Sequence, residues 1–273
     1  MAIMGDSSVV SNNLIIGELV QRELIAQSKL LSTIMNVSSF AKAGLESIQF
    51  PKAGNFNVVK KASLTPVTTQ ALTYTTDQLD LDQQAVVRWS VEWKAALQSE
   101  VAVLQDAIGR ASRAHAKQVD VDIYDELIAG ATDLGNSGAA TFRREDIVTL
   151  LTALDNNDVP EEGRFLAINP TEKGAMLNIS DFINAGDFGS DRVIQKGQIG
   201  EVFGVPVISS TVVLAGAPVM YHNEAAAIGF QKSPEFRQDQ DMDNLADDYV
   251  LWQLYGLKSL LNSNAAITMT VAV

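Results

Sequence analysis

The feature that most constrains the fold is the proline-free stretch 94–129, in which apolar side chains recur every three or four positions. This spacing predicts one continuous helix, which at 1.5 Å per residue would span roughly 54 Å. The seam is narrow and rich in alanine, and its spacing departs from a heptad after Ala111. We therefore expect the helix to lie across a sheet rather than in a coiled coil, with a possible bend at Gly109. The seam consists of Leu97, Val101, Leu104, Ile108, Ala111, His115, Val119, Ile123 and Leu127.

The preceding segment, 47–93, has the pattern of strands and turns. A strand at 48–50 stops at Pro51, and the return strand alternates apolar with polar residues so that Trp89 and Trp93 share one face. Between the two, 62–84 is rich in threonine and poor in large apolar residues. A two-stranded ribbon alone is marginal in water. The sequence therefore predicts a long projecting loop that rests on something else, as a lid in a monomeric enzyme or on a neighbour in an assembly.

On either side of these elements we expect an N-terminal helix and a mixed α/β body. Asn12 and Asn13 can cap an amphipathic helix over 14–31. The glycine-rich segment 130–140 is the best domain boundary, and Thr141 can cap the helix that follows it. The remaining expectations are a helix up to the turn at 155–160, a strand at 164–168, a helix from Thr171, and a β-rich tail over 249–273.

Charge and composition exclude several classes of protein. With 20 Lys and Arg against 33 Asp and Glu, the net charge of −13 repels a phosphate backbone, so a nucleic-acid reader is not expected. The absence of cysteine excludes disulfides, thiolate metal sites and thiol nucleophiles. No stretch is apolar enough for a membrane span and the start lacks a basic signal region, so we expect a soluble protein retained in its cell. Residues 1–61 carry +2, which suits docking onto an acidic neighbouring copy as well as ordinary variation.

A search for chemistry predicts no catalytic, cofactor or metal site. There is no nucleophile elbow or phosphate loop, and two histidines cannot build a His-rich metal site. His115 falls on the helix seam, where a packed or partly exposed core histidine is expected. His222 and Glu224 fit a surface polar pair better than an acid/base dyad. The glycines at 197, 200 and 204 do not have the spacing of a dinucleotide-binding loop and are expected to be turn residues.

The acidic run 239–248 is the one place where a metal could bind. It begins like a calcium loop, but Asn244 stands where glycine permits the sharp turn and Val250 where a bidentate glutamate is needed. A solvated acidic turn is therefore expected. A metal-dependent hydrolase using Asp239, Asp241 and Asp243 stays a remote alternative.

The order of these elements resembles the major capsid proteins of tailed bacteriophages with the Hong Kong 97-type fold. Several stretches resemble the family locally: 165–170 (Phe-Leu-Ala-Ile-Asn-Pro), 197–210 with its Gly-Val-Pro-Val segment, and the closing sheet at 225–231, 255–260 and 264–267. The resemblance implies an α+β fold in four parts. These are an N-terminal arm (1–46), an extended β-loop (47–93), a peripheral domain with a long spine helix (94–140 plus parts of 225–273), and a mixed α/β axial domain (141–224 plus part of the C-terminal region).

What the resemblance implies is a coat protein of an icosahedral virion head. Pentamers and hexamers of this homo-oligomer would enclose double-stranded DNA without binding it sequence-specifically, after assembly in the bacterial cytoplasm. A separate scaffolding protein, a portal and optional decoration proteins are the implied partners, with no membrane and no cofactor. Some members cross-link a loop lysine to a neighbour, which singles out Lys60 or Lys61. The candidate inter-subunit contacts are Lys60, Lys61, Tyr74 and Arg22.

Three other functions remain open. Encapsulin-type nanocompartments resemble the same fold at a similar length but enclose cargo enzymes rather than a genome. A metal-dependent hydrolase would use the acidic cluster in a monomer or small oligomer. In an adhesin, the threonine-rich loop would bind a ligand.

Overall fold

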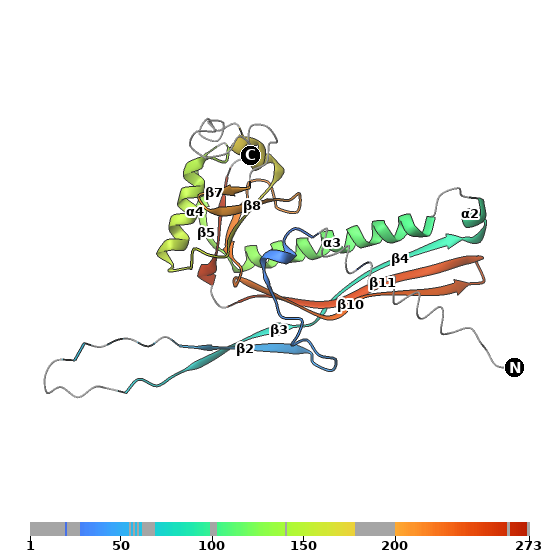
Figure 1. Cartoon of the computed structure of the whole chain (residues 1–273), viewed down its shortest axis with the longest axis horizontal. Coiled ribbons are helices and arrows are strands. Elements are labelled where there is room, and N and C mark those ends of the chain that lie inside the picture. Colours follow the sequence, from blue (N-terminus) through green and yellow to red (C-terminus); the bar gives the residue numbers. More distant parts are fainter. Residues whose placement is uncertain are drawn as a thin grey trace.

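The computed structural model describes residues 20, 28–54, 56, 58, 60–61, 69–98, 103–139, 141–177, 200–260 and 263–271. Two larger sheets and a two-stranded ribbon carry the fold (Figure 1). The elements are the 3-10 turn η1 (Leu31–Thr33), β1 (Met35–Asn36), β2 (Ser47–Ala53), β3 (Tyr74–Asp80), β4 (Gln83–Glu92), α2 (Trp93–Gln98), α3 (Val103–Gly130), β5 (Thr132–Asn136), α4 (Arg144–Asn156), β6 (Arg164–Ile168), α5 (Pro170–Leu177), β7 (Glu201–Val202), β8 (Val205–Ser209), β9 (Val219–His222), β10 (Ala226–Asp241), β11 (Ala246–Ser259), η2 (Ser263–Ala265) and β12 (Ala266–Thr270).

Helix α3 lies along a four-stranded sheet of order β1-β10-β11-β4, as its alanine-rich seam predicts (Figure 1). Its inner side chains, including Val119, Ile123 and Leu127, are almost fully buried. Closer to the start of α3, the rings of Trp89, Phe236 and Tyr249 pack together with centroids 5.6–6.1 Å apart. The long helix is therefore held on the sheet by two apolar clusters, one around Val119, Ile123 and Leu127 and one around Trp89, Phe236 and Tyr249.

The helix is shorter than the sequence predicts. It begins at Val103, and the preceding helical turn, α2, points away from the axis of α3 in Figure 1. Leu97, placed on the buried seam by its spacing, is 86% exposed. The strand of the return leg is confirmed, with alternate residues from Ala85 to Val91 half-buried, but Trp93 opens α2 instead of ending that strand.

The second body is a six-stranded mixed sheet of order β5-β12-β9-β6-β8-β7, packed against α4 and carrying α5 after β6. The strand at 164–168 and the helix after Asn169 are confirmed. The glycine-rich segment contains a strand, β5, which pairs with β12. One expectation is wrong, because α4 is capped by Arg143 and Asp146 rather than by Thr141. The backbone N–H of Arg143 donates to the Asp146 carboxylate at 2.8 Å, which is one half of a capping box.

The N-terminal helix predicted over 14–31 falls mostly outside the described residues. Val20 is helical and buried against Phe236, Tyr249 and Leu251. Residues 28–30 are not helical, and η1 follows them.

The ribbon β2–β3 projects from the first body, and its root crosses the four-stranded sheet (Figure 1). Ile48, Leu79 and Leu81 at the root are buried against Val37, Ala41 and Ala227. At the crossing Gly256 faces β3 so closely that a Cβ atom there would lie 2.1 Å from the Asp80 carbonyl oxygen. Its cross-strand partner is a second glycine, Gly229. The missing side chain of Gly256 thus allows the backbone of β3 to cross close to β11.

The close crossing predicts that Gly256→Ala destabilises the subunit. The added methyl group forces the backbone of β3 away from β11, and such overpacking costs about 1–3 kcal/mol of unfolding free energy. Thermal unfolding of the purified subunit should show a midpoint several degrees lower. Gly109→Ala is the matched control, because no atom lies within 4 Å of the added Cβ and alanine favours a helix interior. Equal melting temperatures for the wild type and Gly256→Ala would contradict the account of the crossing.

Candidate assembly surfaces

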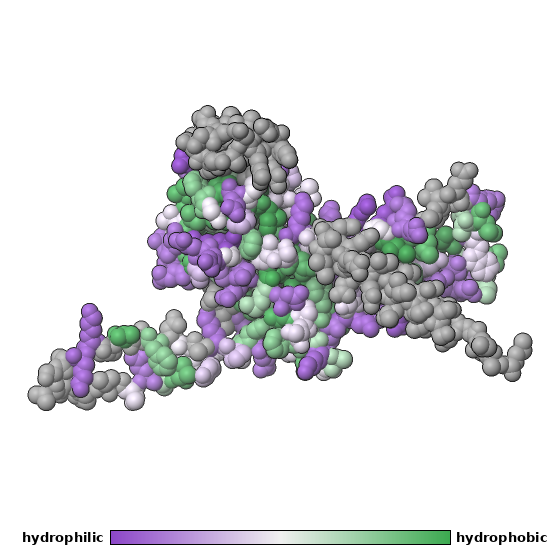
Figure 2. Space-filling model, in the orientation of Figure 1, coloured by the Kyte–Doolittle hydropathy of each residue, from purple (hydrophilic) through white to green (hydrophobic). Residues whose placement is uncertain are grey.

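The projecting loop exposes large apolar side chains away from both cores. Phe56 is 61% exposed, Val58 95% and Tyr74 65%. Figure 2 shows hydrophobic residues next to hydrophilic ones on the projecting ribbon. No described residue of the same chain covers these side chains. Exposed apolar surface of this kind is typical of an interaction site.

The predicted contact residues are distributed unevenly. Lys60, Lys61 and Tyr74 all lie on the projecting loop and are exposed, whereas Arg22 lies outside the described residues. The stretch 51–76 contains three lysines and no acidic residue, although the whole chain carries −13. The outer part of the loop, 51–76, is thus basic, whereas the chain as a whole is acidic.

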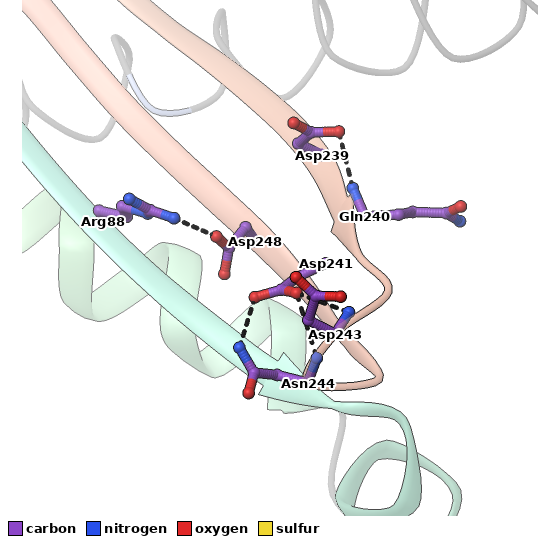
Figure 3. Close-up of polar contacts among 7 residues, drawn as sticks. All are labelled: Arg88, Asp239, Gln240, Asp241, Asp243, Asn244 and Asp248. Atoms are coloured by element: carbon purple, nitrogen blue, oxygen red, sulfur yellow. Dashed lines mark hydrogen bonds and ion pairs between the residues drawn. The ribbon is translucent and has the colours of Figure 1, made fainter.

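The acidic run forms the hairpin between β10 and β11 (Figure 3). Asp241 closes the turn, because its carboxylate accepts hydrogen bonds from the backbone N–H of Asp243 at 3.0 Å and from the Asn244 side chain at 2.7 Å. The amide of Asn244 is the main cause of the lowered pKa of Asp241. Arg88, on β4, is paired with Asp248 on β11. These groups serve the hairpin, and in the described part of the chain no three His, Asp or Glu side chains are placed to share a metal ion.

The segment that precedes η1 is fastened to α3 by one buried carboxylate. Asp120 is 4% exposed and accepts hydrogen bonds from the backbone N–H groups of Lys29, at 3.0 Å, and Leu30, at 3.1 Å, as well as from the Ser28 hydroxyl. Lys29 also donates its Nζ to the carbonyl oxygen of Ser209, at 2.7 Å. A single residue of α3 thereby anchors residues 28–30, which precede η1.

The two histidines have structural partners. His115 is 1% exposed, its Nε2 lies 3.3 Å from the Leu251 carbonyl oxygen, and burial lowers its pKa. The expectation of a packed core histidine is confirmed. His222 is buried as well, and its ring contacts the carbonyl oxygen of Glu162 and the backbone N–H of Glu224. No hydrogen bond joins it to the Glu224 carboxylate among the described residues, so the predicted side-chain pair is wrong.

Several solved structures share this arrangement of elements. A chain from Mycobacterium phage Che8 superposes with a TM-score of 0.77 at 20% identity, over 89% of this chain and 91% of that one. A chain from the capsid of cyanophage P-SCSP1u gives 0.73 at 17% identity, over 88% and 86%. A virus-like particle from Pyrococcus furiosus gives 0.63 at 10% identity, over 94% and 99%. No curated protein matches in sequence. The phage capsid protein family model matches residues 83–265.

The chain belongs to the phage capsid protein family. Its α+β fold is the Hong Kong 97-type fold that the order of elements indicates, and it is a major capsid protein of a bacteriophage. No helix in the described part of this capsid protein is long and apolar enough to cross a membrane.

Sequence reasoning missed several residues that define these surfaces. The exposure of Phe56 and Val58 has a sequence signal, because both stand in a stretch with few other large apolar residues. The buried role of Asp120 has no sequence signal, since an acidic residue on an amphipathic helix is more often exposed to solvent. Gly256, inside an otherwise apolar strand, is a signal of close backbone approach that the prediction did not use.

The Asp120 contacts predict that Asp120→Ala destabilises the capsid subunit. The change leaves one buried and one partly buried backbone N–H group without an acceptor and costs about 2–4 kcal/mol of unfolding free energy. Denaturant unfolding of the subunit measures the loss. Asp125→Ala is the control on the same helix, since Asp125 is exposed and its removal should change stability by less than about 0.5 kcal/mol. The role assigned to Asp120 is wrong if the two variants unfold alike.

The environment of His115 predicts a dependence of stability on pH. Above about pH 6.5 the imidazole is neutral in both the folded and unfolded states. As the pH falls below that value, the unfolded chain takes up a proton that the folded subunit does not, because burial lowers the folded pKa, and stability decreases. The difference in melting temperature between pH 7.5 and 5.5 should be larger for the wild type than for His115→Gln. Identical differences would contradict the account.

Proposed function

We propose that this capsid protein forms the icosahedral head shell as pentamers and hexamers, held together in part by the extended loop of each copy lying on its neighbour. The observation that carries the proposal is the exposure of Phe56, Val58 and Tyr74 on a ribbon that no described part of the same chain covers. Burial of such side chains between copies stabilises a shell by roughly 25 cal/mol per Å² of apolar surface.

The parts of the shell subunit follow from the described elements. We assign the extended loop to 47–93, the peripheral domain to α3 with β10 and β11, and the axial domain to the six-stranded sheet with α4 and α5. The N-terminal arm, 1–46, enters the body where Asp120 holds Lys29 and Leu30. Lys60, Lys61 and Tyr74 are proposed as inter-subunit contacts of the loop, and Arg22 as one of the arm.

The remaining roles rest on the family and the charge. We propose a structural rather than enzymatic protein, located in the virion capsid and assembled in the host cytoplasm. A scaffolding protein, a portal and optional decoration proteins are its proposed partners. The net charge of −13 supports enclosure of DNA without tight binding, because a basic inner surface would hold phosphates strongly.

A nanocompartment shell is the second candidate. The superposition on the virus-like particle from Pyrococcus furiosus favours it, because that chain is covered over 99% of its length. The family match favours the phage head. The contents of purified particles, DNA or protein cargo, separate the two.

Replacing the exposed apolar residues of the loop tests the proposed function. The double variant Phe56→Ser with Val58→Ser should keep the melting temperature of the free subunit, since both side chains are exposed before assembly. It should fail to form particles, as measured by sedimentation and electron microscopy of full-length protein, with its scaffolding protein where one is needed.

The matched control is Phe56→Leu with Val58→Ile, which preserves apolar surface and should still assemble. Normal particles from the serine variant would contradict loop docking as the basis of assembly.

A further inference from the structure

A small pocket of about 160 Å³ lies where the segment before η1, the helix α3 and the turn after β8 meet. Among the described residues, three cationic side chains line it: Lys29 from the segment before η1, and Arg113 and Lys117 from α3. Sites for drug-sized ligands are larger, at roughly 300–1,000 Å³. The pocket therefore has room for one small chemical group.

The two helix cations at this pocket have no acidic partner. Arg113 and Lys117 are exposed, lie about one helical turn apart, and form no ion pair in the part of the chain that the structure describes. Arg110, on the same helix but outside the pocket, is paired with Asp106 at 2.8 Å. The Nζ of Lys29 donates to the Ser209 carbonyl oxygen at 2.7 Å, which leaves its other hydrogens for a further acceptor.

One carboxylate lines the pocket as well, but its oxygens are already used. Asp120 accepts hydrogen bonds from the Ser28 hydroxyl and from the backbone N–H groups of Lys29 and Leu30. Among the described lining residues the cations thus outnumber the acids by three to one, in a chain whose net charge is −13. This local excess of positive charge favours an anion.

The turn after β8 adds hydroxyl groups to the pocket. Thr211 is exposed, and its hydroxyl has no hydrogen-bond partner among the described residues. Ser210 is buried, and its oxygen accepts from the backbone N–H of Val212 at 3.4 Å, so its own proton is available to another acceptor. Guanidinium, ammonium and hydroxyl groups are the donors with which proteins bind phosphate oxygens.

We propose that this pocket binds one phosphate group, and that in a filled head the group belongs to the backbone of the enclosed DNA. The donors come from three elements of the fold, which suits the tetrahedral oxygens of a phosphate better than the two coplanar oxygens of a carboxylate. Contacts to phosphates carry no base information, in keeping with DNA that is enclosed without sequence-specific binding.

A single phosphate contact is compatible with the acidic chain. Exposed charges more than about 8–10 Å apart are largely screened at physiological salt, so the acidic groups elsewhere do not cancel the field of Arg113 and Lys117 in the pocket. The inference rests on the proposed shell function and adds a place where the shell touches its contents. Free inorganic phosphate is the other source of the same chemical group.

Titration of the free subunit with inorganic phosphate tests the pocket without shells. Saturable changes in the backbone amide NMR signals of Lys117 and Thr211 are expected, with none from chloride at equal ionic strength. Arg113→Gln with Lys117→Gln should weaken binding about ten-fold or more, because hydrogen bonds to charged groups are lost. The matched control, Lys94→Gln with Arg110→Gln, removes the same charge from exposed positions outside the pocket and should bind like the wild type.

A neutral substitution separates a formed site from general attraction between charges. Thr211→Val removes one hydroxyl at nearly constant shape and should weaken phosphate binding about three- to ten-fold, the factor for one net hydrogen bond. Equal affinities of the two double variants, or a wild-type affinity of Thr211→Val, would reduce the pocket to a diffuse basic surface and overturn the proposal.

Binding of a short DNA duplex to the subunit at low salt tests the proposed source. Each phosphate contact contributes about 0.9 to the slope of log K against log salt concentration. The variant Arg113→Gln with Lys117→Gln should lower this slope by about that amount, while the control pair should leave it closer to the wild-type value. Equal slopes for both variants would overturn DNA as the source.

Cryo-electron microscopy of DNA-filled particles and empty shells, both in phosphate-free buffer, decides the occupant. Density for a phosphate group in the pocket of the filled particles only is the expected result. Density that depends on added phosphate, and not on DNA, would keep the phosphate site and overturn DNA as its source. An acidic side chain of another protein in the pocket would overturn the inference.

The inference and the proposed function fail in different ways. Normal shells from a subunit that binds no phosphate would leave the proposed function intact and remove the pocket. A chain that forms no shells under any condition would remove the proposed function and the DNA source, whereas the phosphate titration would still decide the pocket.

Discussion

The close passage of β3 over Gly256 is the contact on which the rest of the architecture depends. A ribbon of two strands has too little apolar surface to stabilise itself, so β2 and β3 need an anchor at one end. The absence of a side chain at Gly256 lets the ribbon root approach the sheet, and Leu79 and Leu81 are buried there. The anchored root holds the outer loop away from the body, where its apolar side chains are available to another copy.

The long helix has a complementary role. Apolar packing holds α3 on the sheet, while single polar residues on it make specific connections: Asp120 to the N-terminal segment, Asp122 to Tyr255 and Glu126 to the backbone N–H of Ser259. A buried polar group stabilises only when its partners are in place. These contacts therefore fix the positions of the helix, the sheet and residues 29–30 relative to one another.

Local sequence patterns were sufficient for elements whose structure is decided by nearby residues. The alternation around Trp89, the strand 164–168 and the Asn169–Pro170 helix start all follow from spacing and capping chemistry. Patterns failed where a distant partner decides the outcome. The segment after Gly130 contains the strand β5 because β12 offers it a parallel partner. Leu97 is exposed because it lies in α2, which is separate from α3.

The candidate surfaces were predictable to a lesser extent. A projecting loop could be inferred from threonine-rich sequence between two strands, but the residues that anchor it could not. Gly256 closely approaches the backbone of Asp80, which is far away in sequence. A cavity between α3 and β4 is lined by residues of three elements that no local pattern brings together. Long-range juxtaposition, rather than propensity, creates both features.

The most direct test of the central claim is electron microscopy of particles formed by the wild-type chain, expressed with and without a scaffolding protein and separated on a gradient. The account predicts closed shells in at least one of these conditions, with the extended loop of each subunit lying on a neighbouring copy. Particles whose subunits touch without their loops, or a chain that stays monomeric in both conditions, would contradict it.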